Sequence, residues 1–131
     1  MGDNGHDKRP PRSHLTLRYL KSIRACSAAQ REFEELFGQK ATIAEVVKAL
    51  HRKRYGNWEA WLLAWTAKDI VEAMLIAGAR VNANFGFALL KAAERREKPR
   101  ARLLLDYGAR ISRSGLMEDE LRWVLKIRAQ I

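Results

Sequence analysis

One pattern occurs twice in the chain, and this internal repeat constrains the fold more than any other feature. The segment VEAMLIAGARVNAN (71–84) aligns with ARLLLDYGARISRS (101–114): an apolar helix end, then Gly-Ala-Arg, then a β-branched residue. Gly78 and Gly108, 30 positions apart, let the chain turn with a positive φ at a helix end. A single pair of short amphipathic helices cannot bury its apolar face alone, so neighbouring pairs are expected to stack.

The rest of the sequence predicts more helices and no strand. Apolar residues at three-residue steps predict a helix over 15–25. Ser27 with Gln30, and Thr42 with Glu45, have the spacing of a capping box at a helix start. No segment shows sustained period-two alternation. We therefore predict an all-α fold of seven to eight short helices, stacked as antiparallel pairs.

Residues 57–112 resemble ankyrin repeats, in which paired antiparallel helices precede a Gly-Ala-x-Val/Ile signature. Here the signature ends at Val81 and Ile111. Three differences are visible: the Thr-Pro-Leu-His start is missing, the usual Asp is replaced by Arg80 and Arg110, and the spacing is shorter. The resemblance implies an ankyrin-like helical repeat whose hairpin between units is trimmed.

The N-terminal half is similar to small helical proteins of phages and bacterial mobile elements. Those proteins carry an Ala-Cys-x-x-Ala helix and then a Trp-x-x-Trp-Leu-Leu helix. The matching positions are Ala25, Cys26, Ala29, Trp58, Trp61, Leu62 and Leu63. The resemblance implies a phage-type accessory protein, such as an inhibitor of a host complex of the anti-CRISPR kind.

The length of 131 residues indicates one domain. Residues 1–13 are polar and predict a disordered basic tail, so 14–131 would form a single α-helical repeat domain. No apolar run approaches the roughly 18–20 residues that span a membrane. Cys26 is the only cysteine, which excludes an internal disulfide and favours a buried thiol in a cytoplasmic protein.

Enzyme signatures are missing from the sequence. There is no Gly-rich phosphate loop, no HExxH and no nucleophile elbow. His6, His14 and His51 have no spacing that suits a metal site, and His51 is expected to face solvent at a helix end. We predict no catalysis, no cofactor and no metal.

Basic residues are the candidates for partner binding. Lys and Arg number 25 against 15 Asp and Glu, giving a formal charge of +10 that favours acidic partners. Inter-helix turns of a helical stack are expected to line one edge, although an ordinary solvated surface would carry such charges too. The candidate residues are Arg52, Lys53, Arg54, Arg80, Phe85, Arg95, Arg96, Lys98, Arg100, Arg102, Arg110 and Arg113.

These residues predict a non-enzymatic protein-binding module that docks on an acidic protein or nucleoprotein surface. Sequence-independent binding of DNA or RNA is the alternative, since phosphates attract the same cations. The sequence leaves the oligomeric state open.

NWEAWLLAWT (57–66) holds three of the four tryptophans. They are spaced by three and four, and the opposite side of the helix is apolar too, which indicates an inner helix. We expect Trp61 and Trp65 to be largely buried.

Overall fold

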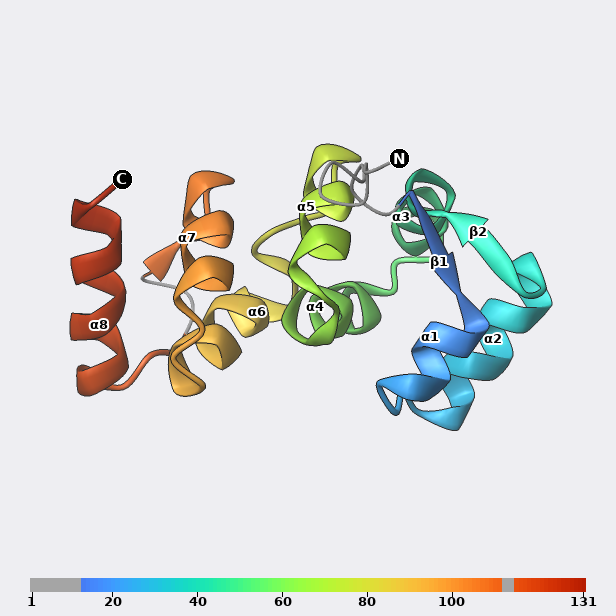
Figure 1. Cartoon of the computed structure of the whole chain (residues 1–131), viewed down its shortest axis with the longest axis horizontal. Helices are drawn as coiled ribbons and strands as arrows, with labels where there is room; N and C mark the ends of the chain where they lie inside the picture. Colours follow the sequence, from blue (N-terminus) through green and yellow to red (C-terminus); the bar gives the residue numbers. More distant parts are fainter. Residues whose placement is uncertain (1–12, 112–114) are drawn as a thin grey trace, which may run out of the picture.

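The computed structural model describes residues 13–111 and 115–131 (Figure 1). This part of the chain contains eight helices, which confirms the predicted all-α class and helix number. The elements are β1 (His14–Thr16), α1 (Leu17–Ser22), α2 (Ser27–Phe37), β2 (Lys40–Thr42), α3 (Ile43–Arg52), α4 (Gly56–Trp65), α5 (Lys68–Ile76), α6 (Ala83–Glu94), α7 (Lys98–Asp106) and α8 (Glu118–Ala129).

Two short strands, β1 and β2, were not predicted. They pair antiparallel, with Leu15 opposite Ala41, and both of these side chains are buried. The predicted helix over 15–25 is therefore wrong at its start. The helix α1 begins at Leu17 because the Thr16 side chain accepts a hydrogen bond from Tyr19 N.

Helices α4 to α8 stack along the long axis of the molecule (Figure 1). The helix α6 packs against α4 on one side and α8 on the other, while α7 packs against α5 and α8. Fully buried residues of α4 and α6 are mostly alanine: Ala60, Ala64, Ala88, Ala92 and Ala93. Because alanine is small, the two helix backbones approach closely.

The predicted glycine turns are confirmed. After α5, Gly78 has φ +100°, and Ala79 N donates to Met74 O at 2.9 Å. After α7, Gly108 has φ +93°, and Ala109 N donates to Leu104 O at 3.0 Å. Each glycine thus closes its helix in the left-handed conformation of a Schellman motif.

The same motif closes three more helices with arginine in place of glycine. The left-handed residues after α1, α3 and α6 are Arg24 (φ +61°), Arg54 (φ +59°) and Arg96 (φ +56°). The following residue of each donates to the carbonyl five positions back, as Tyr55 N does to Leu50 O at 2.9 Å. The stack and the N-terminal part of the chain therefore share one way of ending a helix.

One of the two predicted capping boxes is confirmed. Thr42 N donates to Glu45 Oε1 at 2.8 Å, and Glu45 N donates to Thr42 Oγ1 at 3.1 Å. The backbone and then the hydroxyl hydrogen bond from Thr42 hold the pKa of Glu45 below its ordinary value. The box predicted at Ser27 is wrong: Cys26 is the N-cap of α2, and Gln30 Nε2 instead donates to Ala25 O.

The predicted tail 1–13 lies outside the described residues except for Ser13, whose carbonyl accepts from Ile43 N at 2.9 Å. Within the described ranges, none of the helices combines the length and apolar character needed to span a bilayer.

Candidate functional site

The tryptophan helix α4 confirms the expectation of core packing only in part. Trp58, Trp61 and Trp65 pack against the core but stay half-buried. The fully buried face of α4 is formed instead by Ala60, Leu63 and Ala64. Small side chains are needed where α4 meets α6, so the bulky indole rings lie on the flanks of the helix.

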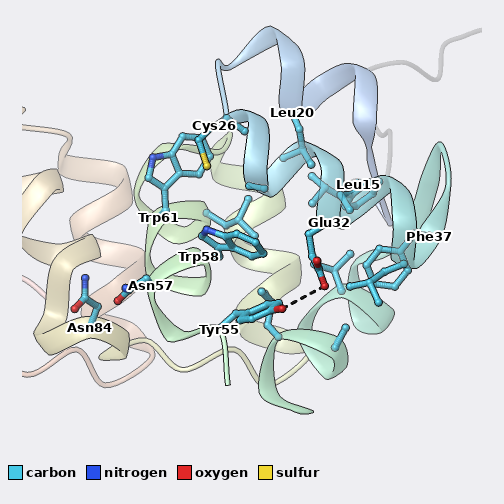
Figure 2. A pocket seen from close by; sticks show the side chains of 18 of the residues that line it. Leu15, Leu20, Cys26, Glu32, Phe37, Tyr55, Asn57, Trp58, Trp61 and Asn84 are labelled. Carbon is cyan, nitrogen blue, oxygen red and sulfur yellow. Dashed lines mark hydrogen bonds between the residues drawn. The ribbon is translucent and has the colours of Figure 1, made fainter. Parts of the chain in front are cut away.

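Trp58 and Trp61 line a pocket of about 370 Å³. Its walls come mainly from α2, α3, α4 and the start of α6, with Leu15 of β1 and Leu20 of α1 (Figure 2). Most of the lining is apolar, including Phe33, Phe37 and Leu50. We call this cavity the aromatic pocket. Its lining includes the exposed residues Cys26, Asn57 and Asn84, so it opens to the surface.

Few polar groups reach the aromatic pocket. The Tyr55 hydroxyl donates to Glu32 Oε2 at 3.2 Å, the contact drawn in Figure 2. Lys53 Nζ lies 3.7 Å from the same oxygen. Among the described residues that line the pocket, Glu32 is the only carboxylate, and its charge is already compensated.

A strained turn lies beside the aromatic pocket at the start of α6. Asn84, Phe85 and Gly86 all have positive φ, at 52°, 58° and 78°. Asn84 and Phe87 line the pocket, whereas Phe85 is 79% exposed. A left-handed conformation costs a non-glycine residue about 1–2 kcal/mol, so this exposed phenyl ring is held in place at a conformational cost.

A buried glutamate contradicts the expectation that His51 faces solvent. Glu59 is 1% exposed, and its Oε2 lies 2.7 Å from His51 Nε2. The same oxygen accepts from Arg80 N at 2.7 Å. His51 therefore hydrogen-bonds to a buried carboxylate, and this contact places the end of α3 beside the turn that follows α5.

A second hydrogen-bonded link joins that turn to the next one. Asn82 Nδ2 donates to Gly108 O at 3.2 Å, and Arg110 N donates to Asn82 Oδ1 at 2.7 Å. The carboxyl-terminal ends of α3, α5 and α7 thus form a continuous row. Figure 1 shows α5 and α7 side by side and running in the same direction.

Five of the predicted cations lie on this row. All five are exposed, and negative helix ends favour cations at such positions. We define the basic row as Arg52, Lys53, Arg54, Arg80 and Arg110.

The other predicted cluster, in the turn between α6 and α7, is largely engaged within the molecule. Arg95 lies 3.3 Å from Glu97 Oε2, and its guanidinium stacks 4.5 Å from the Trp65 ring. Arg96 lies 5.5 Å from the centre of the Trp123 ring. Lys98 and Arg102 are exposed.

Arg100 is a correction to the candidate list. It is 9% exposed, and its guanidinium donates to Leu63 O at 2.8 Å and to Thr66 O at 2.6 Å. These carbonyls end α4 and have no partner within that helix. Arg100 therefore caps α4 in the interior and is not available to a partner.

The prediction that all basic turns line one edge is wrong. The helix α7 begins beside the 95–98 cluster and ends before Arg110, and its nine residues span about 13 Å. The helices α5 and α7 are parallel, so their carboxyl-terminal ends lie at one edge of the stack. The turn that joins α6 to α7 precedes α7 and therefore lies at the opposite edge. Arg113 lies outside the described residues.

Within residues 13–111 and 115–131, no three His, Cys, Asp or Glu side chains are grouped to hold a metal ion. No family model, curated protein or solved structure matches the chain. The resemblances to ankyrin repeats and to phage proteins therefore stay predictions.

Proposed function

We propose that this protein is a non-enzymatic binding module that docks on an acidic protein or nucleoprotein surface through the basic row. One observation carries the proposal. Arg54, Arg80 and Arg110 are exposed on adjacent helix ends, and none of them forms an ion pair with a described residue. Their charges are therefore free to meet an acidic surface.

Apolar side chains beside the row favour a protein partner. Ile76 at the end of α5 is 67% exposed, and Tyr107 at the end of α7 is 41% exposed. Protein interfaces are enriched in arginine and tyrosine and combine cations with apolar contact area. The row presents both kinds of side chain on one surface.

An inhibitor of the anti-CRISPR kind would use the same surface. Its arginines would mimic or block a contact that normally faces phosphate, and the loose resemblance to phage proteins supports this version. Sequence-independent binding of DNA or RNA is the second candidate, favoured by the formal charge of +10.

Charge reversal of the row tests the main proposal. The variant Arg54→Glu, Arg80→Glu, Arg110→Glu is compared with the equal charge change Arg18→Glu, Lys126→Glu, Arg128→Glu at exposed positions outside the row. In affinity capture from the native host, we expect the partner of the wild-type chain to be lost only with the row variant. Equal retention by both variants would contradict the proposal.

A gel-shift assay separates the two candidates. Direct nucleic-acid binding would appear with mixed DNA or RNA oligonucleotides at low salt and weaken steeply as salt is added. We expect no such shift at protein concentrations that saturate the captured partner. A shift with arbitrary oligonucleotides that the row variant abolishes would favour the second candidate.

A further inference from the structure

The aromatic pocket has the size of a site for large side chains. Its volume is about 370 Å³. An apolar cavity of about 150 Å³ is enough to hold a benzene molecule. The aromatic pocket can therefore take two side chains of the size of leucine or phenylalanine, and its apolar walls would remove both from water.

Cations lie at the rim of this apolar surface. Lys53 Nζ is 3.7 Å from Glu32, and Lys91 Nζ is 5.5 Å from the centre of the Phe87 ring. Both Glu32 and Phe87 line the pocket. Lys91 also pairs with Glu94 at 3.0 Å, whereas the exposed Arg54 next to the lining residue Tyr55 has no ion pair among the described residues. With three cations against the two carboxylates of Glu32 and Glu94, the rim keeps a positive charge and thus favours a negatively charged occupant.

The pocket and the basic row share their boundary. Lys53 belongs to the row and pairs with a pocket residue, while Asn82, which joins the turns of the row, lies two positions before the lining residue Asn84. A partner held on the row would therefore reach the pocket mouth. The 79% exposed Phe85 lies between the lining residues Asn84 and Phe87 in the chain, so an inserted side chain would lie close to it.

The walls of the pocket favour a helical occupant. An extended peptide gains affinity by pairing its backbone with a free sheet edge. The helices α2, α3 and α4 use their backbone groups internally, so they leave few such groups for an added strand. A helix satisfies its own backbone and presents side chains three or four positions apart on one face.

We propose that the aromatic pocket takes the apolar side chains of an acidic amphipathic helix of a partner protein. Two apolar residues, three or four positions apart, enter between α2 and α4, and flanking carboxylates meet Lys53, Arg54 and Lys91. This inference rests on the proposed function, since it names the chemistry of the partner that the basic row attracts.

Three labelled helical peptides of about 18 residues serve as probes with the full chain. The first is rich in Glu and has a Leu and Phe stripe on one face; the second has the same composition with the stripe scattered; the third has Lys in place of Glu. By fluorescence anisotropy we expect the first to bind about tenfold tighter than the other two. Equal binding of the first two peptides would overturn the inference.

A pocket-filling variant identifies the surface used. Ala29 lines the pocket, and the neighbouring Ala28 is exposed on the same helix outside it. We expect Ala29→Phe to weaken binding of the first peptide about tenfold, and Ala28→Phe to leave it unchanged. We expect Phe85→Ala to weaken binding by less, while Leu125→Ala, another exposed apolar truncation, has no effect.

The row variant makes the two proposals separable. Peptide binding that is lost on charge reversal of the row but insensitive to Ala29→Phe would overturn the pocket inference and leave the proposed function standing. Loss with Ala29→Phe and no response to row reversal would contradict docking through the row. Nile red binding without any peptide binding would instead indicate a small apolar ligand, and a dimer dispersed by Ala29→Phe would indicate a second copy of the chain; either result overturns the inference.

Discussion

Two regions of the molecule are packed in different ways. In the stack, α4 and α6 meet through fully buried alanines, and the contact leaves no room for larger groups. In the N-terminal part, residues 13–55, large rings such as Phe33 and Phe37 pack at a tilt, 5.2 Å apart. Where this part meets α4, a pocket of about 370 Å³ stays open. The buried alanines of α4 and α6 thus pack without gaps, whereas the bulky side chains of the N-terminal part leave an open pocket.

Removing the interior cap of α4 should have the largest effect on the stack. Arg100→Met leaves the buried carbonyls of Leu63 and Thr66 without their donor. We expect the free energy of unfolding to fall by about 3 kcal/mol in urea denaturation. The exposed Arg102→Met on the same helix should change it by less than about 0.5 kcal/mol, and equal effects would contradict an interior role for Arg100.

One substitution placed in each region tests the packing contrast directly. Ala92 in the stack is fully buried, whereas Ala29 lines the pocket. Ala92→Leu should lower the free energy of unfolding by about 1–3 kcal/mol, because the extra methyl groups have no space. Ala29→Leu should be neutral or stabilising by up to about 1 kcal/mol. Thermal unfolding of both variants checks this, and equal destabilisation would remove the contrast.

The helix ends offer a smaller test of the same comparison. A Cβ added at Gly78 meets no atom within 4 Å, so Gly78→Ala isolates the cost of a positive φ, about 1 kcal/mol. In the N-terminal part, Arg54→Gly relieves the same conformation and should stabilise by about 0.5 kcal/mol. Denaturant midpoints measure both changes. Destabilisation by Arg54→Gly would show that the arginine side chain contributes to stability there.

The smallest expected effect concerns the capping box that begins α3. The pKa of Glu45 is lowered in the folded protein, chiefly by the hydrogen bond from Thr42 N. Its stabilising contribution is therefore complete above the ordinary value of 4.5 and is lost as the pH falls through the lowered folded pKa. Unfolding measured from pH 7 down to about 3 should show a shallower acid decline for Glu45→Gln than for the wild-type chain. Thr42→Ser keeps both the backbone donor and the hydroxyl of the box, so this control should retain the wild-type decline.

Helix ends show what sequence reasoning could and could not predict. Five helices end in the same left-handed motif, but only two of them have glycine, the residue type that predicts it, at Gly78 and Gly108. Arginine is common on helix surfaces, so Arg24, Arg54 and Arg96 carry no local signal of a positive φ. The repeat was found in the sequence because its turns use glycine.

Long-range polar contacts were missed for a different reason. Arg100 meets carbonyls 34 and 37 positions away, and Glu59 meets the backbone of Arg80, 21 positions away. Nothing near these residues in the sequence indicates a distant partner. The three-residue strands β1 and β2 are likewise too short to show the alternation that identifies a strand.

The sequence predicted which residue types form the candidate surfaces, but not which edge of the molecule they occupy. Cations were expected on turns, and five of them do share one row, but the direction of α7 separates them from the 95–98 cluster. The pocket depends on where α2 lies relative to α4, which periodicity within a single helix does not specify.

The position of Cys26 gives the molecule a built-in reporter. It is the single thiol of the chain and lies beside Trp61 at the pocket (Figure 2). The expectation of a buried thiol is wrong, because Cys26 is exposed at the N-cap of α2. A maleimide dye would therefore attach at one defined place without any engineered residue. Indole rings quench many dyes by contact. A ligand that enters the pocket and separates the dye from Trp61 would therefore raise the dye's fluorescence, which can be followed in real time with an unlabelled ligand.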